Sequence, residues 1–390
     1  MNRIVISVIA LCVHIGMEAQ SMDVVLESVE KNNIELQAVR KGNEAAVWEM
    51  KAGNNLEGLS VEYSPFYRKG VSGMASSELV VTQGFDFPTL YAARKKAGDL
   101  QQTVFDWQYQ TVRRDILLEA KNLCIDLIFL EKERALLEMR GKNADSLLML
   151  YEKKMAEGDA TIIEINKIKM ERMGVLADRA KNKAAHNVSM QALVALNGNE
   201  PLSFSESCYP DFVMENDWES MKERILSADP ALRMLQAETE VSLQEVKVSK
   251  HTGIPKLEVG YRRNTEMREA SNGFLVGASI PIFSNRHKVK AAKAQFVTAQ
   301  MRRDNEYLQA ENKVRAQYEE IKMLKSAVEV YDTHLMYATL EVLRTAVEEG
   351  GLSLADYYIE ADAIYKGLQE HLRLENQYMK AVAEFYKNDL

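Results

Sequence analysis

The residue types that most often do chemistry are present in this sequence, but they lack the spacing that catalysis or metal binding requires. The six histidines stand at positions 14, 186, 251, 287, 334 and 371, without the spacing of metal ligands. Dinucleotide-binding glycines, a phosphate loop, a zinc-protease helix motif and a nucleophile elbow do not occur in the sequence. We therefore expect no enzyme, no catalytic residue, no cofactor and no metal site.

Acidic residues and glycines gather instead at two corresponding places. Glu157-Gly158-Asp159-Ala160-Thr161 corresponds to Glu349-Gly350-Gly351-Leu352-Ser353. Gly158, Gly350 and Gly351 suit tight turns because glycine enters the left-handed backbone region without a steric penalty. The pattern predicts two turns that carry negative charge, and their role depends on the elements that hold them.

The two turns belong to an internal repeat, in which features of the first half recur in the same order roughly 195 residues later. Asn33-Ile34-Glu35-Leu36 corresponds to Asp229-Pro230-Ala231-Leu232, and Leu59-Ser60-Val61-Glu62-Tyr63 corresponds to Leu257-Glu258-Val259-Gly260-Tyr261. Each pair indicates the beginning of a helix followed by a strand. The repeat predicts one architecture built twice.

A basic stretch follows the second strand of each copy. Gly84-Phe85-Asp86-Phe87-Pro88 corresponds to Ser279-Ile280-Pro281-Ile282-Phe283. Arg94-Lys95-Lys96 comes after the first of these segments, and Arg286-His287-Lys288 comes after the second. We expect a long helix to begin at this point in both copies.

Apolar residues at helical spacing predict five helices. They run from Met22 to about Gly53, from Pro88 to about Met155, from Ala160 to Leu196, from Asn285 to about Val347, and from Ser353 to Tyr386. The longest would span on the order of 100 Å at 1.5 Å per residue. Each copy therefore forms a long helical hairpin, and the charged residues at every turn exclude a helical membrane span.

Four shorter segments alternate apolar with polar or small residues and are predicted as strands: Leu56 to Arg68, Ser77 to Phe87, Lys256 to Arg263 and Asn272 to Phe283. Their length and their single apolar face are typical of strands in the outer membrane. Two soluble hairpins are the alternative. Four strands cannot close a barrel, however, and a monomer would leave two edges exposed.

The N-terminus and the composition limit the location and the partners. Arg3, the short apolar run Ile4 to Val13 and a small residue at Ala19 predict a signal peptide at residues 1–19. The net charge of −8 argues against a nucleic-acid partner. Cys124 and Cys208 are expected to be unpaired, largely buried thiols, although a disulfide between them is an open alternative.

Over essentially the whole mature chain, this duplicated order of helix, two strands, proline, long helix, glycine turn and returning helix resembles the TolC family of outer-membrane efflux and secretion channels. The resemblance implies a mainly α fold with a membrane β-barrel portion: duplicated long helical hairpins form an α-barrel tunnel, and four β-strands per protomer close a twelve-stranded barrel in a homotrimer. Residues 20–196 would be the first structural repeat, 197–218 an equatorial connector and 219–390 the second repeat.

The resemblance also suggests where the mechanism lies. In the family, an acidic residue six positions beyond the turn glycine lies near the closed periplasmic end, and Glu164 and Asp356 occupy those positions. Three copies of each would form an acidic ring that favours cations. A solvated charge on an outer helix face is the alternative for each. The tips, with Gly158, Asp159, Gly350 and Gly351, would meet a periplasmic adaptor protein.

The implied function is the outer-membrane exit duct of a tripartite efflux system, with a tunnel that extends into the periplasm and exports small molecules such as drugs or metal ions. Its partners would be the periplasmic adaptor (membrane fusion) protein, an inner-membrane pump of the resistance-nodulation-division type and outer-membrane lipid. Two alternatives are a type I protein secretion channel and a periplasmic coiled-coil adaptor or scaffold without a pore.

Overall fold

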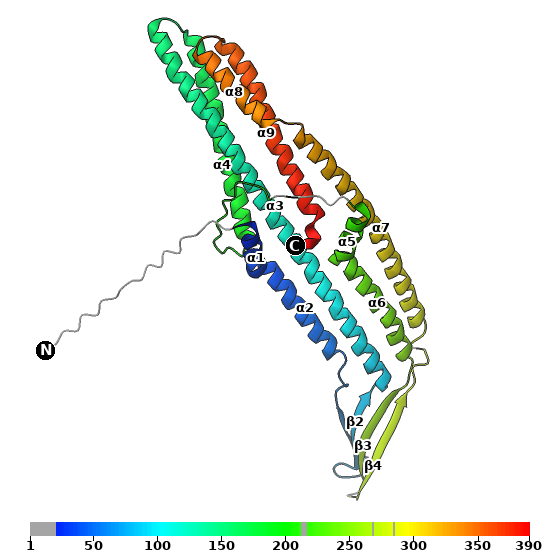
Figure 1. Ribbon diagram of the computed structural model, residues 1–390. Helices are drawn as coiled ribbons and strands as arrows, with labels where there is room; N and C mark the ends of the chain where they lie inside the picture. The colour runs from blue at the N-terminus through cyan, green and yellow to red at the C-terminus, as the bar shows by residue number, and fades with distance from the viewer. Residues whose placement is uncertain (1–20, 211, 213–216, 267–268, 284) are drawn as a thin grey trace, which may run out of the picture.

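The protein is long and narrow, with its strands at one end and two helical turns at the other (Figure 1). The computed structural model describes residues 21–390 except 211, 213–216, 267–268 and 284. The predicted signal peptide at 1–19 lies outside the described residues.

Each half contributes helices and two strands in the same order. The first half contains α1 (Met22–Asn32), α2 (Ile34–Ala52), β1 (Ser60–Phe66), β2 (Ser76–Phe85), α3 (Pro88–Glu157) and α4 (Ile162–Leu196). The second half contains α5 (Trp218–Ala228), α6 (Pro230–His251), β3 (Lys256–Glu266), β4 (Glu269–Ser279), α7 (Lys288–Glu329), α8 (Thr333–Glu348) and α9 (Leu354–Phe385), followed by a short 3₁₀ turn (Lys387–Asp389).

The helix α3 runs almost the whole length of the helical part. Pro88 stands at its first turn, where a missing N–H costs nothing, and Gly158 ends it in the left-handed conformation. Its 70 residues correspond to about 105 Å at 1.5 Å per residue. The sequence therefore predicts both ends of α3 to within two residues.

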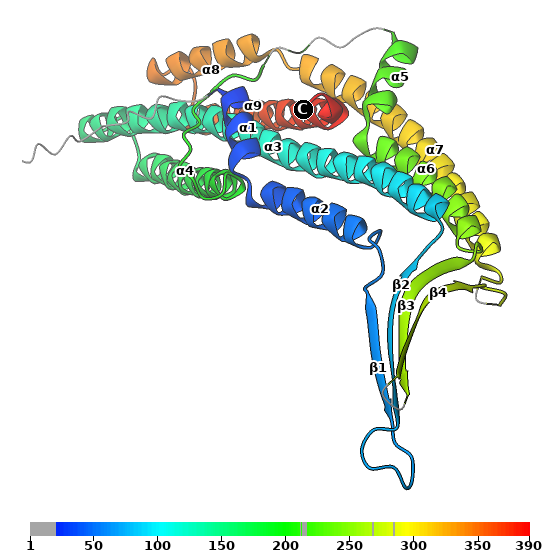
Figure 2. The same cartoon turned by 90° about the horizontal axis from the view of Figure 1, so that it is seen from below.

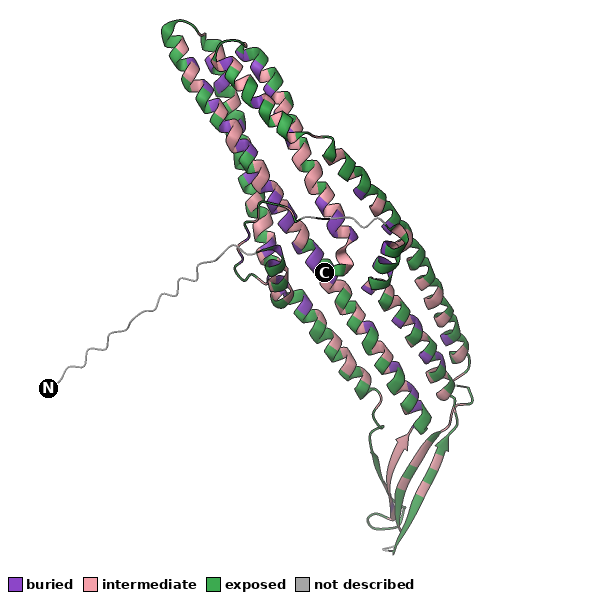
Figure 3. Ribbon diagram, in the orientation of Figure 1, coloured by how far each residue is buried: buried purple, intermediate pink, exposed green. Residues whose placement is uncertain are grey.

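The helices form one curved layer, and α3 lies inside it along its whole length (Figures 1 and 2). Near the strands, α3 packs between α2 and α6, and α6 in turn packs against α7. Towards the turns, α3 packs between α4 and α9, and α9 packs against α8. Figure 3 shows buried residues as interrupted stripes along these contacts, with many exposed residues between them. The helices α2 and α7 therefore form the two edges of the layer near the strands, and α4 and α8 form its two edges near the turns.

Three clusters of buried side chains hold the layer together. The first lies where α1 and the end of α4 meet the middle of α3, and it includes Val25, Ile128 and Leu193. The second lies near the turns, and the third joins α5 and α7 to the end of α9 through Met221 and Phe385. The core is thus distributed along the rod instead of forming one compact centre.

The prediction of one helix from Met22 to Gly53 is wrong, because Asn33 divides it. The backbone of Asn33 is extended, with φ −62° and ψ 122°, and its side chain accepts a hydrogen bond from the Leu36 N–H at 3.0 Å. Asp229 has the same role between α5 and α6 and accepts from the Ala231 N–H at 2.8 Å. Both are N-caps, which satisfy backbone donors that the new helix leaves free.

The prediction of one helix from Asn285 to Val347 is also wrong. The chain leaves the helix between α7 and α8, and the Asp332 side chain accepts a hydrogen bond from the Leu335 N–H at 2.9 Å. An aspartate at this position offers the backbone an alternative partner, which favours a new helix start over continuation. The corresponding part of α3 has no break.

The four strands form one antiparallel sheet in the order β1-β2-β3-β4. All four predicted strands exist, but their ends differ: the predictions run too far at Leu56, Arg68, Phe87 and Phe283 and stop three residues short at Arg263 and Asn272. The ladder between β1 and β2 stops at Ser60 and Thr82, since the Gln83 side chain donates a hydrogen bond to the Glu57 carbonyl at 2.6 Å. The ladder between β3 and β4 stops at Lys256 and Ser279, so the segment from Ile280 to Phe283 leaves the sheet. The edges β1 and β4 have no partner strand among the described residues.

The register separates the residues of the sheet onto two different faces. Val61 lies opposite Val81, which lies opposite Tyr261, which lies opposite Phe274. Cross-strand partners share a face, and side chains alternate along each strand. One face therefore carries an apolar row, with Phe274 94% exposed.

The other face of the sheet is polar. Its rows contain Glu62, Glu78, Arg262 and Glu258, and Arg262 pairs with Glu78 at 3.0 Å. Gly260 also lies on this face, where a Cβ would come within 2.6 Å of the Val81 carbonyl oxygen. One apolar and one polar face are what a strand needs between lipid and a water-filled lumen.

Candidate functional site

Both predicted turns lie at the end of the rod away from the sheet, and their glycines adopt left-handed conformations. Gly158 has φ 90° and Gly350 has φ 82°, and a Cβ at either position would meet no atom within 4 Å. Gly351 does not have a positive φ, so the prediction that it needs the left-handed region is wrong. Its N–H donates to the Ala346 carbonyl at 2.8 Å and closes the second turn.

The two hairpin tips are held side by side. The Lys154 ammonium, one turn before Gly158, donates to the Glu348 carbonyl at 3.5 Å. Beneath the tips, Ile165, Val347 and Tyr357 are each at most 2% exposed. Asp159 is near this contact in sequence, and its N–H donates to the Lys154 carbonyl at 2.8 Å. The tips therefore form one structural unit within a protomer.

Glu164 has a local role that the sequence analysis missed. The Thr161 N–H and hydroxyl donate to the Glu164 carboxylate at 2.7 and 2.8 Å, and the Glu164 N–H donates back to the Thr161 hydroxyl at 3.3 Å. This reciprocal pair is a capping box at the start of α4. The signal was a threonine followed three residues later by a glutamate.

Asp356 stands in the corresponding place at the start of α9. The Asp356 N–H donates to the Ser353 hydroxyl at 3.1 Å, and that hydroxyl donates to the Asp356 carboxylate at 2.6 Å. Each carboxylate thus lies in the first turn of its helix, where the positive end of the helix dipole favours negative charge. No hydrogen bond joins Glu164 to Asp356 within the described residues, and the ring of carboxylates stays a prediction.

A polar network links three helices behind the tips. The Arg140 guanidinium on α3 pairs with Glu171 on α4 at 2.5 Å and with Asp362 on α9 at 3.5 Å. Arg140 also lies over the Tyr365 ring, and Asn143 donates to the Tyr365 hydroxyl at 2.9 Å. These contacts fix the hairpins against each other, because a half-buried guanidinium is costly to separate from its carboxylates.

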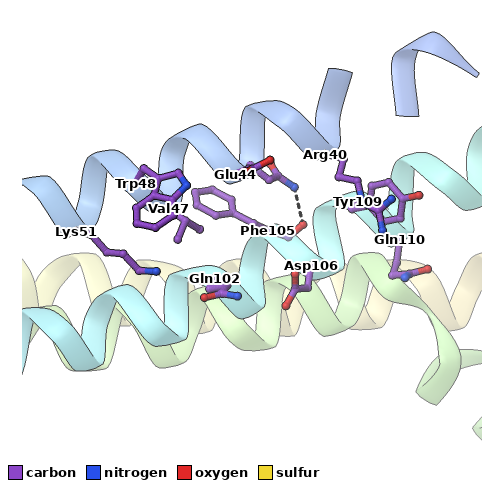
Figure 4. A pocket seen from close by; sticks show the side chains of 11 residues that line it. Arg40, Glu44, Val47, Trp48, Lys51, Gln102, Phe105, Asp106, Tyr109 and Gln110 are labelled. Atoms are coloured by element: carbon purple, nitrogen blue, oxygen red, sulfur yellow. Dashed lines mark hydrogen bonds between the residues drawn. The ribbon is translucent and has the colours of Figure 1, made fainter. Parts of the chain in front are cut away.

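Hollows large enough for a small molecule lie elsewhere, and they are open. One groove of about 520 Å³ lies between α2 and α3, nearer the sheet, with Arg40, Trp48, Phe105 and Tyr109 in its walls (Figure 4). Asn43 donates to the Phe105 carbonyl at 2.9 Å across it. Because α2 is an edge helix, the groove lies along the side of the protomer.

The described residues hold no cluster of three or more histidine, cysteine or acidic side chains that could bind a metal ion. Cys124 and Cys208 do not form a disulfide with each other. Burial raises the pKa of the Cys124 thiol to about 12, whereas Cys208 is exposed, so the expectation that both are buried is wrong for Cys208. Among the helices that the structure describes, none has the length and apolar character needed to pass through a lipid bilayer.

Comparison with known proteins agrees with this architecture. Residues 222–388 match the family model described as outer membrane efflux protein. The match lies in the second half of the chain, and that half resembles the TolC-like outer-membrane efflux channels. The channel has an outer-membrane sheet and a periplasmic helical tunnel, and it is not an enzyme. The match favours the channel over the scaffold without a pore. No curated protein is a significant match to the sequence.

Solved channels have the same fold at low sequence identity. CusC superposes with a TM-score of 0.79 at 13% identity, over 95% of this chain and 92% of that chain. CmeC of Campylobacter jejuni superposes with a TM-score of 0.76 at 13% identity, over 94% of this chain and 85% of that chain. VceC of Vibrio cholerae superposes with a TM-score of 0.74 at 13% identity, over 94% of this chain and 95% of that chain. The efflux channel thus spans nearly the full length of these structures.

Proposed function

We propose that three copies of this channel join edge to edge and form the exit duct of a tripartite efflux system. The observation that carries the proposal is the open sheet. The edges β1 and β4 point in opposite directions, so β4 of one copy can continue antiparallel into β1 of the next. Four strands per copy then give a closed barrel of twelve, and closure removes the exposed edges.

The edges of the helical layer support the same assembly. Val297, Met301 and Leu308 on the edge helix α7 are 44%, 68% and 60% exposed and lie on one helix face. On the opposite edge, the groove beside α2 presents Trp48, which is 61% exposed. Two complementary apolar edges on one protomer are what a closed cyclic oligomer requires.

Light scattering of the detergent-extracted protein, with the detergent mass subtracted, tests this proposal. We expect the mass of three mature chains. A monomer or dimer at the same detergent and protein concentration would contradict the shared barrel, because the described residues of one copy form only four strands.

We further propose that the cargo is small, such as a drug or a metal ion, and that the pump is of the resistance-nodulation-division type. The short connector proposed at 197–218, between repeats 20–196 and 219–390, supports a slender duct of this type. The test is a cell that lacks its own efflux channel and receives this chain with one adaptor–pump pair at a time. Restored resistance to toxic small molecules supports the proposal, whereas secretion of a protein substrate without restored resistance supports a type I channel.

The hairpin tips are the proposed contact with the adaptor, and Glu164 and Asp356 are the proposed acidic constriction. The support is their place at the end of the rod that lies farthest from the membrane sheet (Figure 1). Gly158, Asp159, Gly350 and Gly351 would form the docking surface. Three copies of both carboxylates around one axis would attract cations and repel anions.

A further inference from the structure

The ends of three helices meet just beside the periplasmic side of the sheet and are tied together by hydrogen bonds. The Thr89 hydroxyl on α3 lies 3.1 Å from His251 Nδ1 on α6. Asn285, just before α7, accepts a hydrogen bond from the Thr252 hydroxyl at 2.9 Å and donates to the Ser249 carbonyl at 3.3 Å. Residues from α3, α6 and α7 are therefore neighbours at this level.

This junction is strongly basic, although the chain as a whole carries a net charge of −8. Six exposed cations lie on the three helix ends and are called the basic collar here: Lys95, Lys96, Lys250, Arg286, Lys288 and Lys290. Within the described residues, none of the six forms an ion pair. Arg94 and Lys256, in contrast, pair with Asp86 at 2.7 and 3.6 Å. The positive charge of the collar is therefore not neutralised by ion pairs, whereas that of Arg94 and Lys256 is.

In α7, the placement of this charge opposes the preference of the helix itself. Carboxylates are favoured in the first turn of a helix and cations are disfavoured there. Asp23, Glu35, Glu164, Glu219 and Asp356 stand in the first turns of α1, α2, α4, α5 and α9. The first turns of α3 and α7, the two helices that follow directly from the sheet, have no acidic residue, and neither do those of α6 and α8. In α7 the first turn contains Lys288 and Lys290 instead.

An exposed apolar surface lies directly between the basic collar and the lipid face of the sheet. Ile280, Ile282 and Phe283, between β4 and α7, are 64%, 72% and 82% exposed. Phe87, between β2 and α3, is 39% exposed. Phe87 follows two residues after Phe85, and Ile280 two residues after Ala278, where Phe85 and Ala278 end the apolar face of the sheet. The order from membrane to periplasm is therefore apolar sheet, apolar linker, exposed cations.

We propose that the basic collar binds the headgroups of anionic phospholipids in the periplasmic leaflet of the outer membrane. The apolar linker would enter the acyl region, and the cations would lie at the level of the phosphates. The proposal commits to phospholipid because the collar continues the membrane-facing surface of the sheet. Three copies would carry three such collars around the base of the barrel.

Native mass spectrometry of the purified protein in neutral detergent tests the proposal, with phosphatidylglycerol and phosphatidylethanolamine of identical acyl chains as probes. We expect preferential retention of phosphatidylglycerol by the wild type. The triple variant Arg286→Gln/Lys288→Gln/Lys290→Gln should weaken it on the order of a hundredfold, from about fivefold for each charge. Arginine in place of Lys288 and Lys290 should retain the lipid.

The matched control is Lys169→Gln/Lys181→Gln/Lys183→Gln, which removes the same charge from exposed positions of α4. It should leave lipid retention unchanged. Equal loss in control and collar variants, or equal retention of both lipids by the wild type, would overturn the proposal. So would full displacement by inorganic phosphate at matched ionic strength. If the triple variant does not assemble, high salt must release phosphatidylglycerol but not phosphatidylethanolamine from the wild type.

Discussion

At the scale of single residues, substitutions can separate the structural role of Glu164 and Asp356 from their electrostatic role. Glutamine at position 164 keeps the capping box, since its side chain also accepts from the Thr161 N–H, but it removes the charge. Asparagine at position 356 likewise keeps an acceptor for the Ser353 hydroxyl. The pair Glu164→Gln/Asp356→Asn therefore tests the charge alone.

We expect this double variant to lose cation selectivity in planar-bilayer conductance measurements and to unfold like the wild type. Thr161→Ala is the complementary control, because it removes the cap and keeps the carboxylate. It should cost about 1 kcal/mol of stability and leave selectivity unchanged. Unchanged selectivity in the double variant would mean that the carboxylates serve the helix ends only.

Substitutions of Gly350 test whether the second hairpin tip is a docking surface. A Cβ there meets no atom within 4 Å, so the cost of a side chain is conformational, about 1–2 kcal/mol for most residues in the left-handed region. We expect Gly350→Val to abolish export while the sheet still inserts into the membrane. Gly350→Asn, which tolerates this conformation, is the matched control and should keep export. Valine with full export would argue against docking at this turn.

The two described cysteines should differ in reactivity. Cys124 is buried and its raised pKa keeps the thiol protonated, whereas Cys208 is exposed. A maleimide at pH 8 should label Cys208 in the native protein and label Cys124 only after denaturation, because the thiolate is the reactive form. Peptide mass spectrometry after labelling identifies the site. Rapid native labelling of Cys124 would contradict its burial.

At the scale of elements, the two faces of the sheet should respond differently to charge. Val276 lies on the apolar face and is 82% exposed, while Leu275 lies on the polar face of the same strand. Val276→Arg should destabilise the inserted protein by about 2–4 kcal/mol near the middle of the bilayer. Leu275→Arg is the matched control and should be tolerated. Urea unfolding in lipid vesicles measures both, and equal losses would refute the assignment of the faces.

The sequence predicted most elements because their periodicity is local. Alternation at Val61, Val259 and Val276 identified strands, and the turn glycines identified the hairpin ends. The breaks at Asn33 and Asp332 were missed because the apolar pattern continues across them, while a single side-chain hydrogen bond decides the break. The capping box of Thr161 and Glu164 was readable in the sequence. The register and the contacts between helices depend on packing between distant segments, and no local pattern contains them.

At the scale of the whole molecule, the exposed edges predict that stability depends on assembly. Met301→Asp/Leu308→Asp places two charges on the apolar edge of α7 and should shift the detergent-extracted protein towards monomers. The control Gln309→Asp changes a neighbouring exposed polar position and should leave the trimer intact. Light scattering at two protein concentrations measures the shift. A full trimer in the double variant would exclude this edge from the interface.

The unbroken helix α3 also has a consequence for how the family can vary. Its residue count sets the reach of the rod from the membrane, and the shorter helices α2, α4, α6 and α9 pack along successive parts of it. Seven residues added to α3 alone would lengthen it by about 10 Å and shift every later side chain out of its packing partner. A change of reach therefore requires coordinated insertions in both hairpins, so the packing between helices fixes the distance that the channel bridges.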